Sequence, residues 1–224
     1  SIQQTKDGGY IVAGSSDAGI TDLQGESPLN DYESGNDMFV VKLDSSGNVD
    51  WFTFFGGTGV DNANSIRQTT DGGYIIGGES SAAISTLQGI APLNGYTDNW
   101  DMLAIKLASS GNVSWYTFFG TINNDMVNSI QQTNDGGYII GGYAGDNIPA
   151  LQTKTPLNGY SGFSDPMVIK LDSYGAVTWY TFLGSPGIDG GECIRQTSDG
   201  GYIFVGSAND NIAILDGKTP INAR

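Results

Sequence analysis

A five-residue motif recurs along the chain at a constant interval of 64 residues. It reads Ser/Cys-Ile-Gln/Arg-Gln-Thr, and its four copies begin at Ser1, Ser65, Ser129 and Cys193. The 224 residues therefore hold three complete units and half of a fourth. We assign these units to residues 1–64, 65–128, 129–192 and 193–224. Because the interval never changes, the loops must keep their lengths, and the fold must be one that repeats itself.

Each complete unit contains four short apolar runs separated by turn signals. In the second unit these runs are 65–69, 73–78, 102–107 and 113–119. The Thr-Asp-Gly at 70–72 is typical of a tight hairpin turn between two strands. The pattern predicts four strands in each complete unit and two in the half unit, which makes fourteen.

The third and fourth predicted strands are apolar on both faces, as in 38–43 and 51–55 of the first unit. Such strands need cover on both sides of their sheet. Four-stranded antiparallel sheets that stack face to face around an axis are the blades of a β-propeller. The predicted fold class is therefore all-β, a β-propeller or propeller segment built from three complete blades and a half blade. We expect a single domain over residues 1–224.

Two segments of the repeat resemble known propeller blades. Residues 42–51, Lys-Leu-Asp-Ser-Ser-Gly-Asn-Val-Asp-Trp, resemble the turn before the last strand of quinoprotein-like blades. Residues 71–78, Asp-Gly-Gly-Tyr-Ile-Ile-Gly-Gly, resemble the repeat of bacterial exported propeller proteins. The resemblance covers all units and implies no quinone cofactor. It implies that one tryptophan per unit docks against the neighbouring blade, namely Trp51, Trp115 and Trp179.

Charge and composition exclude several classes of partner. The net charge of −15 disfavours nucleic acid and anionic membrane surfaces. No apolar run approaches the roughly 18 residues that a membrane-spanning helix needs, so we expect no membrane insertion. Cys193 is the only cysteine, which excludes an intrachain disulfide.

The chain has the composition of an exported bacterial protein. Charged residues make up only 15% of it, and histidine is absent. Asn, Ser and Thr take the place of charged residues, which favours an extracellular or cell-surface location. The chain begins at Ser1 with neither a methionine nor a signal peptide, so we expect a processed or excised piece of a longer protein.

One end of each predicted sheet carries all the long loops. We call the segment between the second and third strands the long connection, 15–37 in the first unit. We call the segment between the fourth strand and the next unit the junction loop, 56–63 in the first unit. Both fall on the same face, and hairpin turns occupy the other. Long loops on a rigid scaffold are where binding usually takes place, so this face is the candidate binding surface.

The long connections repeat a Pro-Leu-Asn sequence, then a tyrosine, then an aspartate. An aromatic ring can stack on a sugar while amides and carboxylates bind its hydroxyl groups. The same residues could instead pack the loop and cap its turns. Both interpretations stay open. The candidate ligand-binding residues are Asn30, Tyr32, Asp37, Asn94, Tyr96, Trp100, Asp101, Asn158, Tyr160 and Asp165.

Each junction loop also keeps one acid, and these acids are the candidate metal ligands: Asp61, Asp125 and Asp189. Calcium prefers six to eight oxygen ligands, which carboxylates, carbonyls and water supply. No Asp-x-Asp-x-Asp-Gly loop is present. Calcium therefore stays open as a ligand beside the alternative of solvated acidic turns.

The sequence gives catalysis little support. Without histidine there is no Ser-His-Asp or Cys-His arrangement. Cys193 stands where other units have serine, and the repeated Lys42, Lys106 and Lys170 are expected either to form ion pairs or to be edge residues that extend their charge into water. We therefore expect no enzyme.

Three functional hypotheses follow. The leading one is a non-catalytic extracellular module that recognises a glycan or protein through its long connections and junction loops. The first alternative is a structural subunit of a surface fibre or multi-chain assembly, self-associated through open blade edges. The second alternative, a glycan-active enzyme, is the weakest.

Overall fold

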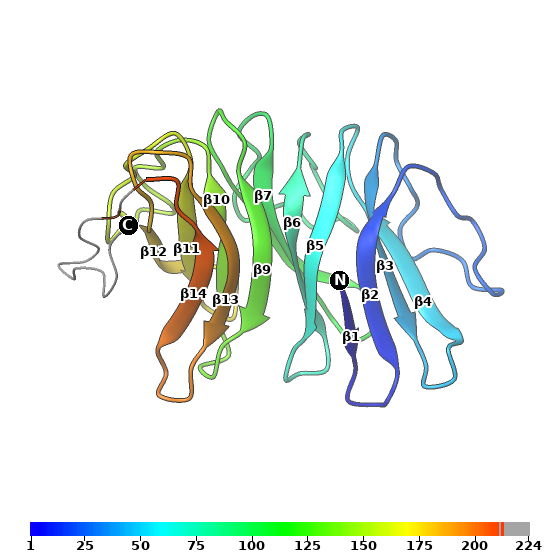
Figure 1. Cartoon of the computed structure of the whole chain (residues 1–224). Coiled ribbons are helices and arrows are strands. Elements are labelled where there is room, and N and C mark those ends of the chain that lie inside the picture. Colours follow the sequence, from blue (N-terminus) through cyan, green and yellow to red (C-terminus); the bar gives the residue numbers. More distant parts are fainter. Residues whose placement is uncertain (211, 213–224) are drawn as a thin grey trace.

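The computed structural model describes residues 1–210 and 212, and this part of the chain is all-β (Figure 1). Its strands form three four-stranded antiparallel sheets and one two-stranded sheet. No helix in the described part is long and apolar enough to cross a membrane. The strands are β1 (Ile2–Gln4), β2 (Tyr10–Ser16), β3 (Asp37–Leu43), β4 (Val49–Phe55), β5 (Asp61–Gln68), β6 (Tyr74–Ser80), β7 (Asp101–Leu107), β8 (Val113–Phe119), β9 (Met126–Gln132), β10 (Tyr138–Ala144), β11 (Asp165–Leu171), β12 (Val177–Phe182), β13 (Gly190–Gln196) and β14 (Tyr202–Ser207).

The prediction of four strands per complete unit and two in the half unit is confirmed. Some predicted boundaries were wrong. The long connection was placed at 15–37, but Ser15 and Ser16 belong to β2 and Asp37 begins β3. The sequence placed Asp61 in a junction loop, but β5 begins at that residue and pairs it with Ser80. Residues 61–64 are mostly polar, so the apolar pattern did not indicate a strand there. The backbone alone makes the strand pairing, which needs no apolar residue. Most of the tail of the fourth unit, 211 and 213–224, lies outside the described residues.

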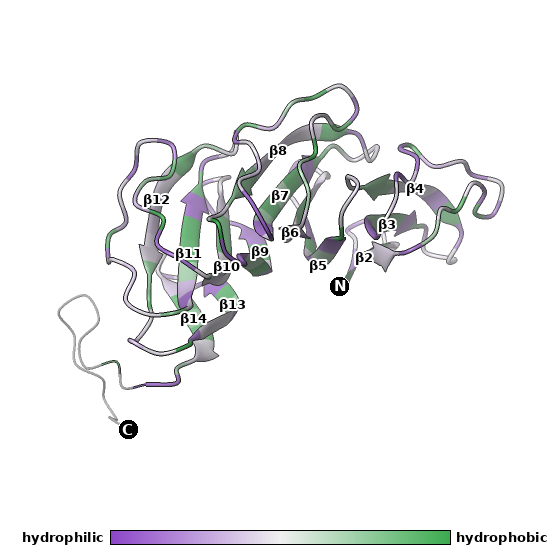
Figure 2. Cartoon of the chain, turned by 90° about the horizontal axis from the view of Figure 1, so that it is seen from above, coloured by the Kyte–Doolittle hydropathy of each residue, from purple (hydrophilic) through white to green (hydrophobic). Residues whose placement is uncertain are grey.

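The sheets stack face to face as an open fan (Figure 2). The second strand of each sheet packs against the first strand of the next, as β2 does on β5, β6 on β9 and β10 on β13. The fourth strands β4, β8 and β12 lie along the outer side of the fan. The first and last sheets stand at opposite ends, so the described residues form an arc rather than a ring.

The core lies between successive sheets, as strands covered on both faces require. Every residue of β7 and β11 is buried. One cluster joins Ile11 and Val40 of the first unit to Ile66 and Ile76 of the second. This burial confirms the prediction drawn from the two-sided apolar strands.

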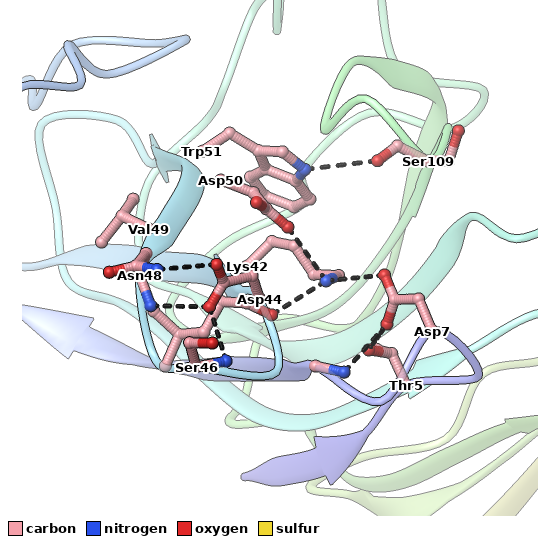
Figure 3. A network of polar contacts seen from close by, with 12 residues as sticks. Thr5, Asp7, Lys42, Asp44, Ser46, Asn48, Val49, Asp50, Trp51 and Ser109 are labelled. Carbon is pink, nitrogen blue, oxygen red and sulfur yellow. Dashed lines mark hydrogen bonds and ion pairs between the residues drawn. The ribbon is translucent and has the colours of Figure 1, made fainter.

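Tryptophans tie each sheet to the next, as the resemblance implied. The Trp51 ring meets Tyr74 edge to face with centroids 5.7 Å apart. Its Nε1 donates a hydrogen bond to Ser109 O, 3.2 Å away in the next unit (Figure 3). Trp115 repeats both contacts, with Tyr138 and with Ser173 O. Trp179 packs against Tyr202.

The repeated lysines form ion pairs, the first of the two roles expected for them. Lys42 Nζ lies 2.9 Å from Asp7 Oδ2 in the first hairpin turn and 3.1 Å from Asp50 Oδ2 (Figure 3). In later units, Lys106 pairs with Asp71 and Lys170 with Asp135, each at 2.9 Å. The lysine therefore fastens the first hairpin turn to the third strand, at the end of the sheet away from the long loops.

Candidate functional site

The long connections cover the outer edges of the sheets. Leu29 N donates to Phe52 O at 2.9 Å, and Phe54 N donates to Asn30 O at 3.3 Å. The same two backbone bonds recur at β8 and β12. The Pro-Leu-Asn segment thus pairs with the fourth strand and blocks an edge that could otherwise pair with another chain. This pairing gives its repetition a structural reason.

The three repeated tyrosines are half-buried and hold their loops in place. Tyr32 packs edge to face on Phe54 at 5.8 Å, and its hydroxyl donates to Asp17 O and Gly35 O. Tyr96 packs on Phe118 in the same way. The third, Tyr160, packs on Phe182 at 5.5 Å. These rings rest on the sheet instead of standing free as a platform.

The repeated asparagines are also engaged within the fold. Asn30 Nδ2 donates to Phe54 O at 3.2 Å. Asn94 and Asn158 donate instead to threonine hydroxyls of the fourth strand, at 3.2 and 3.1 Å. Trp100 is half-buried, and its carbonyl accepts a bond from Asp125 N. These contacts match the interpretation in which the repeated residues pack the loop.

The six repeated aspartates are brought together in pairs, one pair at each junction between units. The members of each pair come from the third strand of one sheet and from the beginning of the next sheet's first strand or the residue just before it, and all are at most 2% exposed. We call them the junction pairs: Asp37 with Asp61, Asp101 with Asp125, and Asp165 with Asp189. Burial, and after it the charge of the partner, raises the pKa of Asp61 to about 6 and that of Asp125 to about 7.

A cavity of about 630 Å³ opens on the long-loop face, where the second, third and fourth units meet. Long connections, junction loops and the ends of second strands all contribute to its wall. The lining residues are Asn99, Asn123, Asn124, Tyr143, Gly145, Phe163, Ser164, Ile188, Asp189, Gly190 and Ser207.

The cavity combines neutral polar groups with an apolar rim. Phe163 is 79% exposed and Ile188 is 64% exposed, so both present free apolar surface. Three asparagine amides and two serine hydroxyls lie beside them. No lysine or arginine is among the lining residues, so nothing there would neutralise an anionic ligand. The chemistry suits a ligand with many hydroxyl groups and an apolar face.

Sequence reasoning missed most of this cavity. It used the residues that recur in every unit, whereas the cavity is lined by positions where the units differ. Asn123 corresponds to Gly59 and Gly187, and Tyr143 corresponds to Ser15 and Glu79. A comparison of the units for their differences could have found these positions.

Glu79 is a second residue that the sequence reasoning overlooked, although it is specific to one unit. It is 2% exposed, and its two oxygens accept bonds from Asn62 and Asn64 at 3.0 and 2.6 Å. Burial raises its pKa to about 7. Because both oxygens are already used inside the fold, Glu79 offers no exposed acid for catalysis.

Comparison with known proteins gives limited help. No family model matches the chain. The chain is similar to the "Regulatory protein FlaEY" of Caulobacter vibrioides, with 28% identity over 236 residues. The match takes in 98% of this chain but spans only 24% of that protein.

Proposed function

We propose that this chain is a non-catalytic, extracellular binding module that holds a neutral oligosaccharide in the cavity on its long-loop face. The observation that carries the proposal is the lining of that cavity. Phe163 supplies an exposed ring for stacking on a sugar. Asn124 supplies an amide for its hydroxyl groups, and Asn99 and Asn123, whose Nδ2 atoms donate to Ile122 O and Gly145 O, supply amide oxygens. Pockets of this kind, apolar with a few placed polar groups, are typical of small-ligand sites.

We further propose that the stacked sheets are blades of a β-propeller. The face-to-face packing, the innermost position of β5, β9 and β13, and the tryptophan contacts between units support this assignment. The constant repeat of the sequence supports it as well. Such a scaffold would hold loops from several units around one cavity.

The proposal is tested with a glycan array and two matched variants. Phe163→Ala removes the ring at the cavity, and Tyr174→Ala removes a ring that is also 79% exposed but lies in a hairpin turn at the opposite end. We expect binding by the unmodified chain and by Tyr174→Ala, and at least a tenfold weaker signal for Phe163→Ala. Equal binding by both variants would contradict the proposed site. Absence of any glycan binding would turn the search to protein ligands.

A second candidate function, assembly through unpartnered sheet surfaces, is favoured by one observation. Ile203 and Val205 of β14 are each 58% exposed. The positions that correspond to Ile203 in the earlier units are Ile11, Ile75 and Ile139, and all three are fully buried. The outer face of β14 therefore presents the surface that a further sheet covers elsewhere in the molecule.

Sedimentation at increasing concentration tests this second candidate. We expect self-association that Val205→Asp abolishes, because an unpaired charge would then be buried in the contact. Ile122→Asp is the control, since Ile122 is 63% exposed but lies in a junction loop. A chain that remains monomeric at every concentration would remove assembly between copies from consideration.

A further inference from the structure

The junction pairs leave carboxylate oxygens buried without partners. The Oδ1 atoms of Asp37, Asp101 and Asp165 accept no hydrogen bond, although all three side chains are fully buried. The other oxygen of each carboxylate accepts a backbone N–H from the residue four positions earlier, at 2.6 to 2.7 Å. An unpaired oxygen on a buried carboxylate is costly, and here it recurs in all three complete units.

No basic side chain compensates these charges. Within residues 1–210 and 212, the lysines in ion pairs are Lys42, Lys106 and Lys170, which contact aspartates of the hairpin turns at the opposite end of the sheets. Instead, each acid with an unpaired oxygen interacts electrostatically with the second acid of its junction pair, which has the same charge. Two buried carboxylates side by side, with no positive charge between them, provide a strong field for a cation.

Glycines lie directly beside the unpaired oxygens. A methyl group on Gly56 would overlap Asp37 Oδ1 and would lie 2.8 Å from Asp61 Oδ2. Methyl groups on Gly120 and Gly184 would overlap Asp101 Oδ1 and Asp165 Oδ1 in the same way. A side chain at any of these three glycines would therefore collide with the carboxylate, so glycine is what lets the unpaired oxygen lie this close to the backbone.

Backbone carbonyls add further oxygens in the third unit. A methyl group on Gly162 would overlap Gly187 O and would lie 2.5 Å from Ser185 O and 3.1 Å from Asp165 Oδ1. Two backbone carbonyls thus approach Gly162 on the same side as the unpaired oxygen of Asp165, so carbonyl oxygens lie close to this junction pair. Carboxylates, carbonyls and water are the ligand set that calcium prefers.

We propose that each junction between units binds one Ca²⁺ ion through the unpaired oxygen of Asp37, Asp101 or Asp165, together with the second acid of the pair, nearby carbonyls and water. No group of three or more His, Cys, Asp or Glu side chains gathers in the described part of the chain. Carbonyls and water must therefore complete the coordination, and a nitrogen- or sulfur-seeking metal such as zinc is disfavoured.

The ion would connect neighbouring units, because its two acids belong to different sheets. A cavity of about 260 Å³ gives a route to the first junction, since it reaches Gly56 from a mouth that contains Asp31 and Glu33. Calcium would thus reinforce the stacking of the sheets.

Calorimetric titration of the chelator-treated chain with CaCl₂ tests the proposal. We expect three ions per chain, and two for each single variant Asp37→Asn, Asp101→Asn and Asp165→Asn. Asp17→Asn is the control because it removes one exposed acid from the same face and should keep three sites. Thermal unfolding gives a second readout, in which the midpoint should rise with calcium concentration, and by less in each variant.

Absence of calcium binding by the unmodified chain would overturn the proposal. So would full stoichiometry in all three variants, or equal binding of Mg²⁺ at the same sites. Tb³⁺ luminescence gives an independent measurement of the same sites, because added Ca²⁺ should displace the bound Tb³⁺ and reduce the signal. It needs little protein, so it can be used for a variant that folds too poorly for calorimetry. A variant that loses all three sites at once would also count against independent junction sites.

Discussion

Two isoleucines at the same place in the repeat should respond very differently to truncation. Ile139 of β10 is fully buried and packs in a cluster with Ile194 of the next sheet. Ile203 of β14 holds the corresponding position, but it is 58% exposed because no described sheet lies beyond it. The comparison isolates the effect of the neighbouring unit, since residue type and local strand are matched.

The expected magnitudes follow from burial. Ile139→Ala removes about three carbon groups worth ~0.8 kcal/mol each and leaves a cavity, so the free energy of unfolding should fall by about 3–4 kcal/mol. Ile203→Ala leaves no enclosed cavity and removes a side chain that is less than half buried, so the loss should be about 1 kcal/mol or less.

Equilibrium urea denaturation, followed by tryptophan fluorescence and circular dichroism, measures both values. The slope of the transition should be the same in the two variants, which shows that the midpoints report stability. Equal losses at the two positions would refute the idea that the units are held together by packing between sheets.

Three further predictions concern polar groups. The pKa of Glu79 is raised by burial from 4.5 to about 7, so ionisation of this side chain opposes folding. The free energy of unfolding should therefore fall as the pH rises from about 4.5 through 7, and Glu79→Gln should flatten this part of the plot of stability against pH. The pKa of Asp71 is lowered to about 2, because hydrogen bonds from Thr69 and Lys106 outweigh burial. The stabilisation that Asp71 gives the folded state should therefore be present above about pH 4 and disappear as the pH falls toward 2. An Asp71→Asn chain whose acid unfolding is unchanged would contradict this. Trp51→Phe removes the hydrogen bond to Ser109 O in the hairpin turn of the next sheet, and should lower the free energy of unfolding by about 1 kcal/mol or more in urea titrations. Trp179→Phe should lower it by less, because residues 1–210 and 212 contain no corresponding hairpin turn beside Trp179.

Much of the fold could be predicted because the repeat makes each signal appear several times. The hairpin turns, the two-sided apolar strands and the lysine ion pairs all follow from residue types at fixed spacing. The start of β5 could not be predicted in this way, since Asp61 and Asn62 pair through their backbones and show no apolar pattern. Nor could the role of Pro-Leu-Asn, which depends on backbone bonds to a strand more than twenty residues away.

The candidate site was harder to predict than the fold. Repetition drew attention to Tyr32 and Asn30, whose contacts show that they hold the loop against its sheet. The cavity depends on Asn123 and Tyr143, which occur once each in their repeat positions and are brought together only by the stacking of units. The pairing of Asp37 with Asp61 likewise depends on the three-dimensional structure, because the two acids lie in strands of different sheets.

The most direct test of the proposed function is a crystal structure of the chain grown with the oligosaccharide that binds most strongly on the array. We predict electron density for the sugar between Phe163 and Asn123, with a ring of the ligand stacked on the phenylalanine. A sugar bound at the hairpin-turn end, or anywhere outside the cavity, would contradict the assignment of the long-loop face as the binding surface.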